Sequence, residues 1–103
     1  MVIELLYFEG CPGWRKAWHE LGDALAASGL DAEVRLRDVA RLTEGELVGF
    51  AGSPSIRIDG RDLEGYAGPG VMACRVYPAN GGRAWPNRDR LRDGLELAAK
   101  AAP

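Results

Sequence analysis

A nearly uninterrupted apolar run at Val2–Phe8 constrains the fold more than any other feature of this chain. Its length, its aromatic residues and its β-branched start are typical of a strand that is buried on both faces, as strands are in parallel or mixed sheets. Glu9-Gly10 ends the run abruptly. Because such a strand needs a covering layer on both sides of its sheet, the run predicts an α/β protein.

A helical pattern begins directly after the short sequence Cys11-Pro12-Gly13. Four large apolar residues recur at the spacing of one face of an α-helix, namely Trp14, Trp18, Leu21 and Leu25. Gly29 supplies the expected stop signal. The pattern predicts a helix that starts close to Cys11 and buries both tryptophans.

The middle of the chain predicts a second strand and a second helix. Ala32–Arg37 alternates between apolar and polar residues, which is typical of a strand with one buried face. Thr43 and Glu46 have the spacing of a capping box, which predicts a short helix bearing Leu47, Val48 and Phe50. Gly52-Ser53-Pro54 ends this helix.

The remaining segments predict a hairpin and a final helix. Ser55–Ile58 alternates and runs into Asp59-Gly60, a strong two-residue turn signal. Val71–Tyr77 is the candidate for the fourth strand, and Asn87 is placed to cap the last helix. The order β-α-β-α-β-β-α predicts one domain over residues 1–103, with a mixed four-stranded sheet in a three-layer α/β sandwich.

Charge and hydropathy exclude several classes of partner. The chain has 103 residues and a formal net charge of −2, with no long run of either sign, so we expect no nucleic-acid and no membrane partner. Its apolar stretches are far shorter than the roughly 20 residues that cross a bilayer. The start of the chain lacks the pattern of a secretory signal, which favours a cytoplasmic location. The two cysteines are then expected to be thiols.

Cys11 occupies a position that favours a reactive thiol. It lies between the end of a strand and the start of a helix, where free backbone N–H groups and the helix dipole stabilise a thiolate. Pro12, expected in the first helical turn, presets the backbone there. We therefore interpret Cys11 as a nucleophile, and a buried structural cysteine that happens to end a strand is the alternative.

Two short motifs make the chain resemble the thioredoxin-like superfamily over nearly its whole length. They are Phe8-Glu9-Gly10-Cys11-Pro12-Gly13-Trp14 and Gly52-Ser53-Pro54-Ser55. With the hairpin and Cys74-Arg75-Val76-Tyr77, the chain looks more narrowly like small bacterial thioredoxin-family proteins found beside or fused to alkylmercury lyases.

The resemblance implies a thioredoxin-like sandwich with Cys11 as the catalytic nucleophile. It also implies a cis peptide bond between Ser53 and Pro54, which is uncommon among X–Pro bonds. The implied substrate groove is lined by Pro12, Gly13, Trp14, Ser53 and Pro54. No cofactor is implied.

The sequence departs from the dithiol pattern of the superfamily, because the motif is C-P-G-W and its fourth residue is Trp14. A lone thiol can form a mixed disulfide, but a second thiol must resolve it. That thiol is either a low-molecular-weight thiol or Cys74. We thus expect a thiol-disulfide exchange protein of the monothiol type, whose partner is a disulfide-containing protein or a small thiol. Trp14 either packs in the core or faces the substrate.

Cys74 is the open question of the sequence. The fourth strand of a thioredoxin-like sheet begins away from the active site, which favours an ordinary buried thiol. Alternatively, the long loop Arg61–Gly70 brings Cys74 to Cys11, as a redox pair or as a two-thiolate site for a soft metal such as mercury. A third hypothesis is a non-catalytic binding module. Two cysteines and His19 fall short of a tetrahedral zinc set, and the sequence leaves the oligomeric state open.

Overall fold

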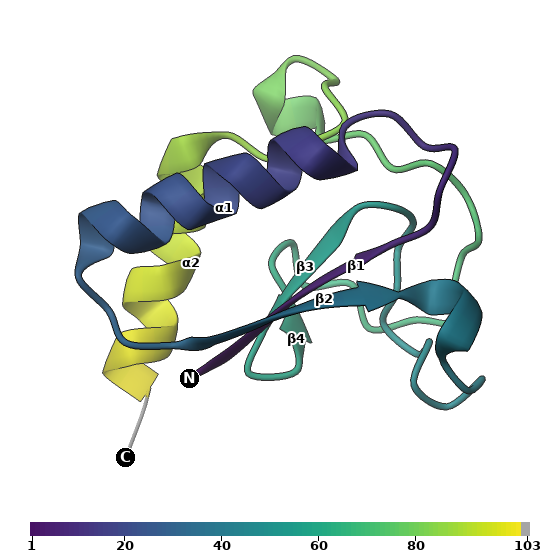
Figure 1. The fold of residues 1–103 in the computed structure, drawn as a ribbon, viewed down its shortest axis with the longest axis horizontal. Helices are drawn as coiled ribbons and strands as arrows, with labels where there is room; N and C mark the ends of the chain where they lie inside the picture. The colour runs from purple at the N-terminus through teal and green to yellow at the C-terminus, as the bar shows by residue number, and fades with distance from the viewer. Residues whose placement is uncertain (102–103) are drawn as a thin grey trace.

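Four strands form one mixed sheet in the order β2-β1-β3-β4 in the computed structural model, which describes residues 1–101 (Figure 1). The central strand β1 (Val2–Tyr7) pairs in parallel with β2 (Glu33–Asp38) and antiparallel with β3 (Ser55–Ile58). The expected α/β class and the mixed four-stranded sheet are therefore confirmed. The predicted domain also contains residues 102 and 103, which lie outside the described range.

Both long helices pack on the same face of this sheet (Figure 1). They are α1 (Trp14–Ser28) and α2 (Arg88–Ala101), and they contact each other as well as the sheet. The buried apolar residues between helices and sheet are Ile3, Leu5, Trp14, Ala17, Leu21, Ala24, Ile56, Ile58, Leu63, Leu91 and Leu95. This cluster is the main core of the protein.

The buried side of α1 differs in part from the expected stripe. Trp14 and Leu21 are buried as predicted, but Trp18 is exposed, and Ala17 and Ala24 take its place in the core. Small alanine side chains let the helix lie close to the elements it covers. The large indole of Trp18 is then accommodated on the flank of the helix, where its ring keeps partial contact with water.

The opposite face of the sheet is covered by turns rather than by a helix. Its smaller apolar cluster consists of Leu6, Val39 and Phe50. The expected capping box does form, since the Thr43 and Glu46 backbone N–H groups each donate to the other residue's side chain at 2.9 and 3.3 Å. However, Gly49 turns to a φ of +85° soon afterwards, so only turns follow and the predicted helix is wrong. The covering segment also includes η1 (Val39–Arg41).

The fourth strand is also not where the sequence places it. β4 (Arg61–Asp62) follows directly on the Asp59-Gly60 turn, so the predicted hairpin is confirmed. Val71–Tyr77, which we call the Cys74 segment, is irregular and makes only isolated bridges at Cys74 and Tyr77. A short 3-10 helix, η2 (Pro78–Asn80), then leads toward α2. The Cys74 segment is thus a crossing strap and not a strand of the sheet.

Candidate active site

Cys11 lies in the loop that connects β1 to α1, as the sequence predicts. The residue is buried, with 6% of its surface exposed. Gly13 is the N-cap of α1 and has a φ of +91°, so Pro12 precedes the cap and is not in the first helical turn. A Cβ on Gly13 would lie 2.5 Å from the Cβ of Ala84, so only glycine lets this turn approach the loop that contains Ala84.

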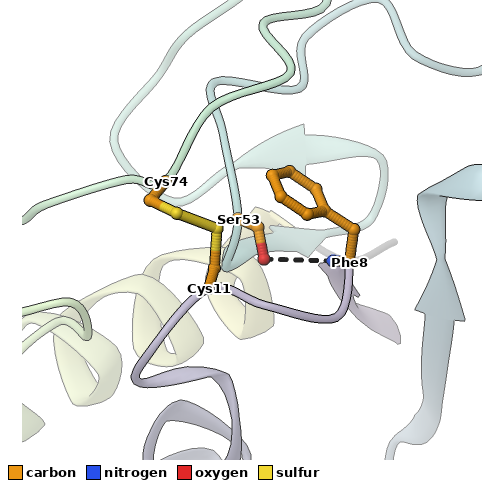
Figure 2. The surroundings of a disulfide bond; sticks show 4 residues. All are labelled: Phe8, Cys11, Ser53 and Cys74. Carbon is orange, nitrogen blue, oxygen red and sulfur yellow. Dashed lines mark hydrogen bonds between the residues drawn. A yellow bond between two sulfur atoms is a disulfide. The ribbon is translucent and has the colours of Figure 1, made fainter.

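Cys74 is joined to Cys11 by a disulfide bond (Figure 2). The Cα atoms of the two residues are 5.5 Å apart, although 63 positions separate them in the sequence. Cys74 is exposed, whereas Cys11 is buried. The preferred expectation of an ordinary buried thiol is therefore wrong for Cys74. The expectation fails because the loop after β4 carries the chain back across the end of β1 instead of continuing into a strand.

The backbone of Ser53 holds the Cys74 segment in place. The Ser53 N–H donates to the Ala73 carbonyl and the Arg75 N–H donates to the Ser53 carbonyl, both at 2.8 Å. The Ser53 hydroxyl accepts from the Phe8 N–H at 3.1 Å, which ties the same residue to the loop before Cys11 (Figure 2). Ser53 therefore connects the two cysteine-bearing segments.

Residues 53 and 54, expected to line a substrate groove, are buried. The peptide bond between Ser53 and Pro54 is cis, as predicted. Both backbone hydrogen-bonding groups of Ser53 are used by the protein's own chain. A Cβ on Gly52 would lie 2.7 Å from the Ala73 carbonyl oxygen, so the strap passes close to this turn. At Ser53, the groove that the resemblance assigns to a substrate is thus occupied by Ala73–Arg75.

A buried ion pair fastens the residue next to Cys74. The Arg75 guanidinium donates to both carboxylate oxygens of Asp62, at 2.7 and 3.0 Å, and to the Ser55 hydroxyl at 2.9 Å. The Asp62 side chain is 0% exposed and that of Arg75 is 10% exposed. Burial by itself lowers the pKa of Arg75, but the hydrogen bonds and charge of Asp62 outweigh it and raise that pKa. The Arg75 guanidinium is therefore charged at neutral pH.

Tyr77 provides a second anchor at the end of the Cys74 segment. Its hydroxyl donates to the Pro54 carbonyl at 2.6 Å, and its ring lies under the Arg75 guanidinium at 4.8 Å. Burial raises the pKa of Tyr77 far above its ordinary value, although the charge of Arg75 opposes this shift. The phenol is therefore a neutral hydrogen-bond donor over the whole accessible pH range.

Trp14 has a packing role in this structure. It is 9% exposed, and its ring stacks on Tyr7 with centroids 4.2 Å apart. The Arg15 guanidinium lies 4.4 Å from the Trp14 ring. Of the two roles that the sequence leaves open for Trp14, the contacts are those of a core residue at the start of α1.

The N-terminal end of α1 favours an anion at Cys11. The first turn of α1 contains no acidic residue, and Arg15 and Lys16 follow the N-cap. The nearest acidic residue in sequence, Glu9, is exposed and its carboxylate lies 3.8 Å from Arg15. Lys16 is paired with Glu20 at 3.1 Å, so both cations already have acidic partners. The N-terminal end of the helix is what favours a thiolate at the buried sulfur once the disulfide is reduced.

Asp62 and Arg75 are the functional residues that sequence reasoning missed. Asp62 accepts the Glu64 and Tyr66 N–H groups at 2.9 and 3.3 Å, as a turn-forming aspartate does. Its second partner, Arg75, lies 13 positions away. The spacing of the two residues carries no periodic signal, so only the family resemblance of Cys74-Arg75-Val76-Tyr77 pointed to this region.

The remaining features to consider are His19, possible metal ligands and membrane-spanning helices. His19 is exposed and lies 3.6 Å from Asp23, one turn along α1. Within residues 1–101, no cluster of three or more His, Cys, Asp or Glu side chains is placed to hold a metal ion. The same residues include no helix that is long and apolar enough to cross a membrane.

Comparisons of this chain with protein family models, with curated proteins and with solved structures find no match. The functional argument therefore depends on the two cysteines and their surroundings.

Proposed function

We propose that this protein carries out thiol-disulfide exchange, with Cys11 and Cys74 as its redox pair in a thioredoxin-like fold. The observation that carries the proposal is that two distant cysteines meet at the N-terminal end of a helix, one buried and one exposed. A structural staple needs no such position. A redox pair gains from it, because the helix stabilises one of its two thiolates.

The thioredoxin-like identity is supported by connectivity and by local features. A parallel β1-α1-β2 unit is followed by the antiparallel pair β3-β4 and by α2. Cys11 stands at the first strand-to-helix junction, and Ser53-Pro54 directly precedes β3. The turns that replace the second helix and the two-residue β4 are departures from the expected three-layer sandwich.

The proposed role of Cys11 is that of the stabilised nucleophile of the pair. When a mixed disulfide with a partner has formed, the remaining protein thiolate attacks the protein sulfur of that bond. The Cys11–Cys74 bond then forms, and the partner leaves as a thiolate that takes up a proton. Because the two cysteines lie side by side, a mixed disulfide on one can be resolved by the other without a small thiol. The proposed chemistry is therefore that of a pair instead of a monothiol.

The test is a turnover assay with reduced glutathione and a small disulfide such as hydroxyethyl disulfide. We expect the wild-type protein to accelerate exchange over the Cys11→Ser/Cys74→Ser double variant, and Cys11→Ser alone to lose most of this rate. A wild-type rate equal to that of the double variant would refute the proposal. Thiolate absorbance in the ultraviolet adds a second readout, since Cys11 should ionise below the value of about 8.5 for a free cysteine.

Adjacency of the two sulfurs also favours a second candidate, soft-metal binding by the reduced pair. Two thiolates are suitable ligands for a soft cation such as mercuric ion. We expect the reduced protein to bind one equivalent of mercuric ion tightly, and Cys74→Ser to lose this tight binding. Equal binding by the wild type and the variant would exclude a two-thiolate site.

The third hypothesis, a non-catalytic peptide-binding module, receives less support. Ala73 and Arg75 already use the Ser53 backbone groups that such a module would offer. A cytoplasmic location remains part of the proposal, because disulfides there are usually transient and catalytic or redox-sensing. The partner we propose is a disulfide-containing protein or a low-molecular-weight thiol.

A further inference from the structure

Building on the proposed exchange chemistry, we infer that Cys74, and not Cys11, is the sulfur that reacts with partner thiols. Cys11 is then the leaving group when the disulfide opens and the attacking thiolate when it closes. In this assignment Cys74, in the strap, exchanges with partners, and the helix-stabilised Cys11 lies underneath the strap.

Exposure is the first observation behind this assignment. Cys74 is exposed and lies between two residues of the strap, Met72 and Val76, that are each 58% exposed. Cys11 has only 6% of its surface exposed. A partner thiolate can exchange only at a sulfur that it reaches, so access favours attack at Cys74.

The second observation is that the strap has anchors of its own. Arg75 is bound to buried Asp62, Tyr77 to the Pro54 carbonyl, and the backbone on both sides of Cys74 to Ser53. None of these contacts involves sulfur. They hold the strap over Cys11 after the disulfide opens, so Cys11 stays covered in the reduced protein as well.

The third observation concerns the leaving group. A disulfide is attacked faster when the departing thiol has a low pKa. The N-terminal end of α1, with no acidic residue in its first turn, stabilises negative charge on Cys11. Attack at Cys74 therefore expels the better of the two thiolates, whereas attack at Cys11 would expel a thiolate on the exposed strap.

The reaction balances with a dithiol partner, or with two small thiols, as the reductant. One partner thiolate attacks the Cys74 sulfur, the bond to Cys11 breaks, and the electron pair leaves on Cys11. A second partner thiolate then attacks the partner sulfur of the mixed disulfide and releases Cys74 as a thiolate, which takes a proton from water. The protein gains two electrons and the partner becomes a disulfide; the reverse sequence reduces a partner disulfide.

The experiment compares single-cysteine variants with Ellman's reagent. Cys11→Ser leaves only Cys74, and Cys74→Ser leaves only Cys11, so each variant reports one thiol. Each rate is divided by the rate of the same variant in guanidinium chloride, which removes any structural protection. We expect Cys74 to react at least tenfold faster than Cys11 on this normalised scale. Equal rates, or a faster Cys11, would overturn the assignment.

A second measurement uses the wild-type disulfide and is independent of whether the variants fold. The oxidised protein is treated with glutathione, quenched with acid and digested, and the adduct is located by mass spectrometry. Glutathione on Cys74 supports the inference and glutathione on Cys11 overturns it. If the wild type accelerates exchange but carries its adduct on Cys11, only this inference fails. If the wild type does not accelerate exchange, the proposed function itself fails.

Discussion

The helix-covered face of the sheet and the Cys74 segment are held in place by different kinds of interaction. Between helices and sheet, apolar side chains are buried together, and seven of them are fully enclosed, namely Ile3, Leu5, Ala17, Leu21, Ile56, Leu91 and Leu95. The Cys74 segment buries only Tyr77 and is held by the disulfide, by hydrogen bonds and by one ion pair. Apolar burial is spread over many contacts, whereas the strap depends on a few specific atoms. Stability and redox behaviour should therefore respond to different substitutions.

The largest expected effect comes from the apolar core. Leu21→Ala removes a fully buried side chain from α1 and should cost about 3 to 5 kcal/mol of unfolding free energy, because it leaves a cavity. Denaturant unfolding of the oxidised and the reduced protein should show the same loss in both. Leu97→Ala is the matched control, since Leu97 is 70% exposed and should change stability by less than about 0.5 kcal/mol. A loss confined to one redox form would contradict the separation of the two regions.

The next effect is expected at the anchor of the strap. Asp62→Asn keeps the shape of the side chain but leaves the Arg75 charge buried without its partner, which should cost about 3 kcal/mol. The same change should loosen Cys74 and shift its disulfide equilibrium in a glutathione buffer about tenfold toward the dithiol, or roughly 30 mV. Asp89→Asn, at the exposed pair with Arg92, is the control and should change neither quantity. An unchanged redox equilibrium in Asp62→Asn would show that the pair does not position Cys74.

Alanine substitutions at two glycines should change the stability of the protein in opposite directions. Gly52→Ala places a Cβ 2.7 Å from the Ala73 carbonyl at a φ of +110°, so we expect a loss of about 2 kcal/mol and a displaced strap. Gly22 lies inside α1, and a Cβ there meets no atom within 4 Å. Gly22→Ala should therefore stabilise the protein by about 0.8 kcal/mol through helix propensity. Thermal unfolding distinguishes the two, and a harmless Gly52→Ala would show that the strap has room to move.

The smallest effect is expected at the surface of the two helices. Hydrogen bonds from Arg88, and then from Lys16, lower the pKa of Glu20 below its ordinary value of 4.5. A carboxyl whose pKa is lowered on folding stabilises the protein above its unfolded pKa, and this contribution is lost as the pH falls through the folded pKa. Glu20→Gln should cost less than about 1 kcal/mol at pH 7 and nothing well below pH 4.5, measured by denaturant unfolding at both values. An equal loss at both pH values would indicate packing and not charge.

Periodic features of the sequence predicted most of the sheet and helices. The β1 run, the α1 spacing and the Asp59-Gly60 turn each report contacts that are local or that repeat along an element. The short helix after Thr43 was wrong because a correct cap does not guarantee enough chain to extend it before Gly49. Local signals were therefore reliable where an apolar face was long, and unreliable where it was short.

The sequence predicted only part of the candidate site. Cys11 and Ser53-Pro54 are identified by their places at the ends of elements. The position of Cys74 next to Cys11 depends on the ion pair between Arg75 and Asp62. This is a contact between two single polar residues that a loop separates in the sequence. No repeat or spacing in the sequence predicts such a contact, and Val71–Tyr77 was interpreted as the fourth strand of the sheet.

The Cys11–Cys74 bond also determines how the molecule would respond to mechanical force. It closes a covalent ring that contains α1, β2, β3 and β4, and leaves β1 and α2 on the two tails. If the chain were pulled from its two ends, the oxidised protein would lengthen to roughly 140 Å, against roughly 360 Å for the reduced protein. Everything inside the ring would carry no load. The redox state of this one bond would thus determine whether the residues between Cys11 and Cys74 bear the applied force.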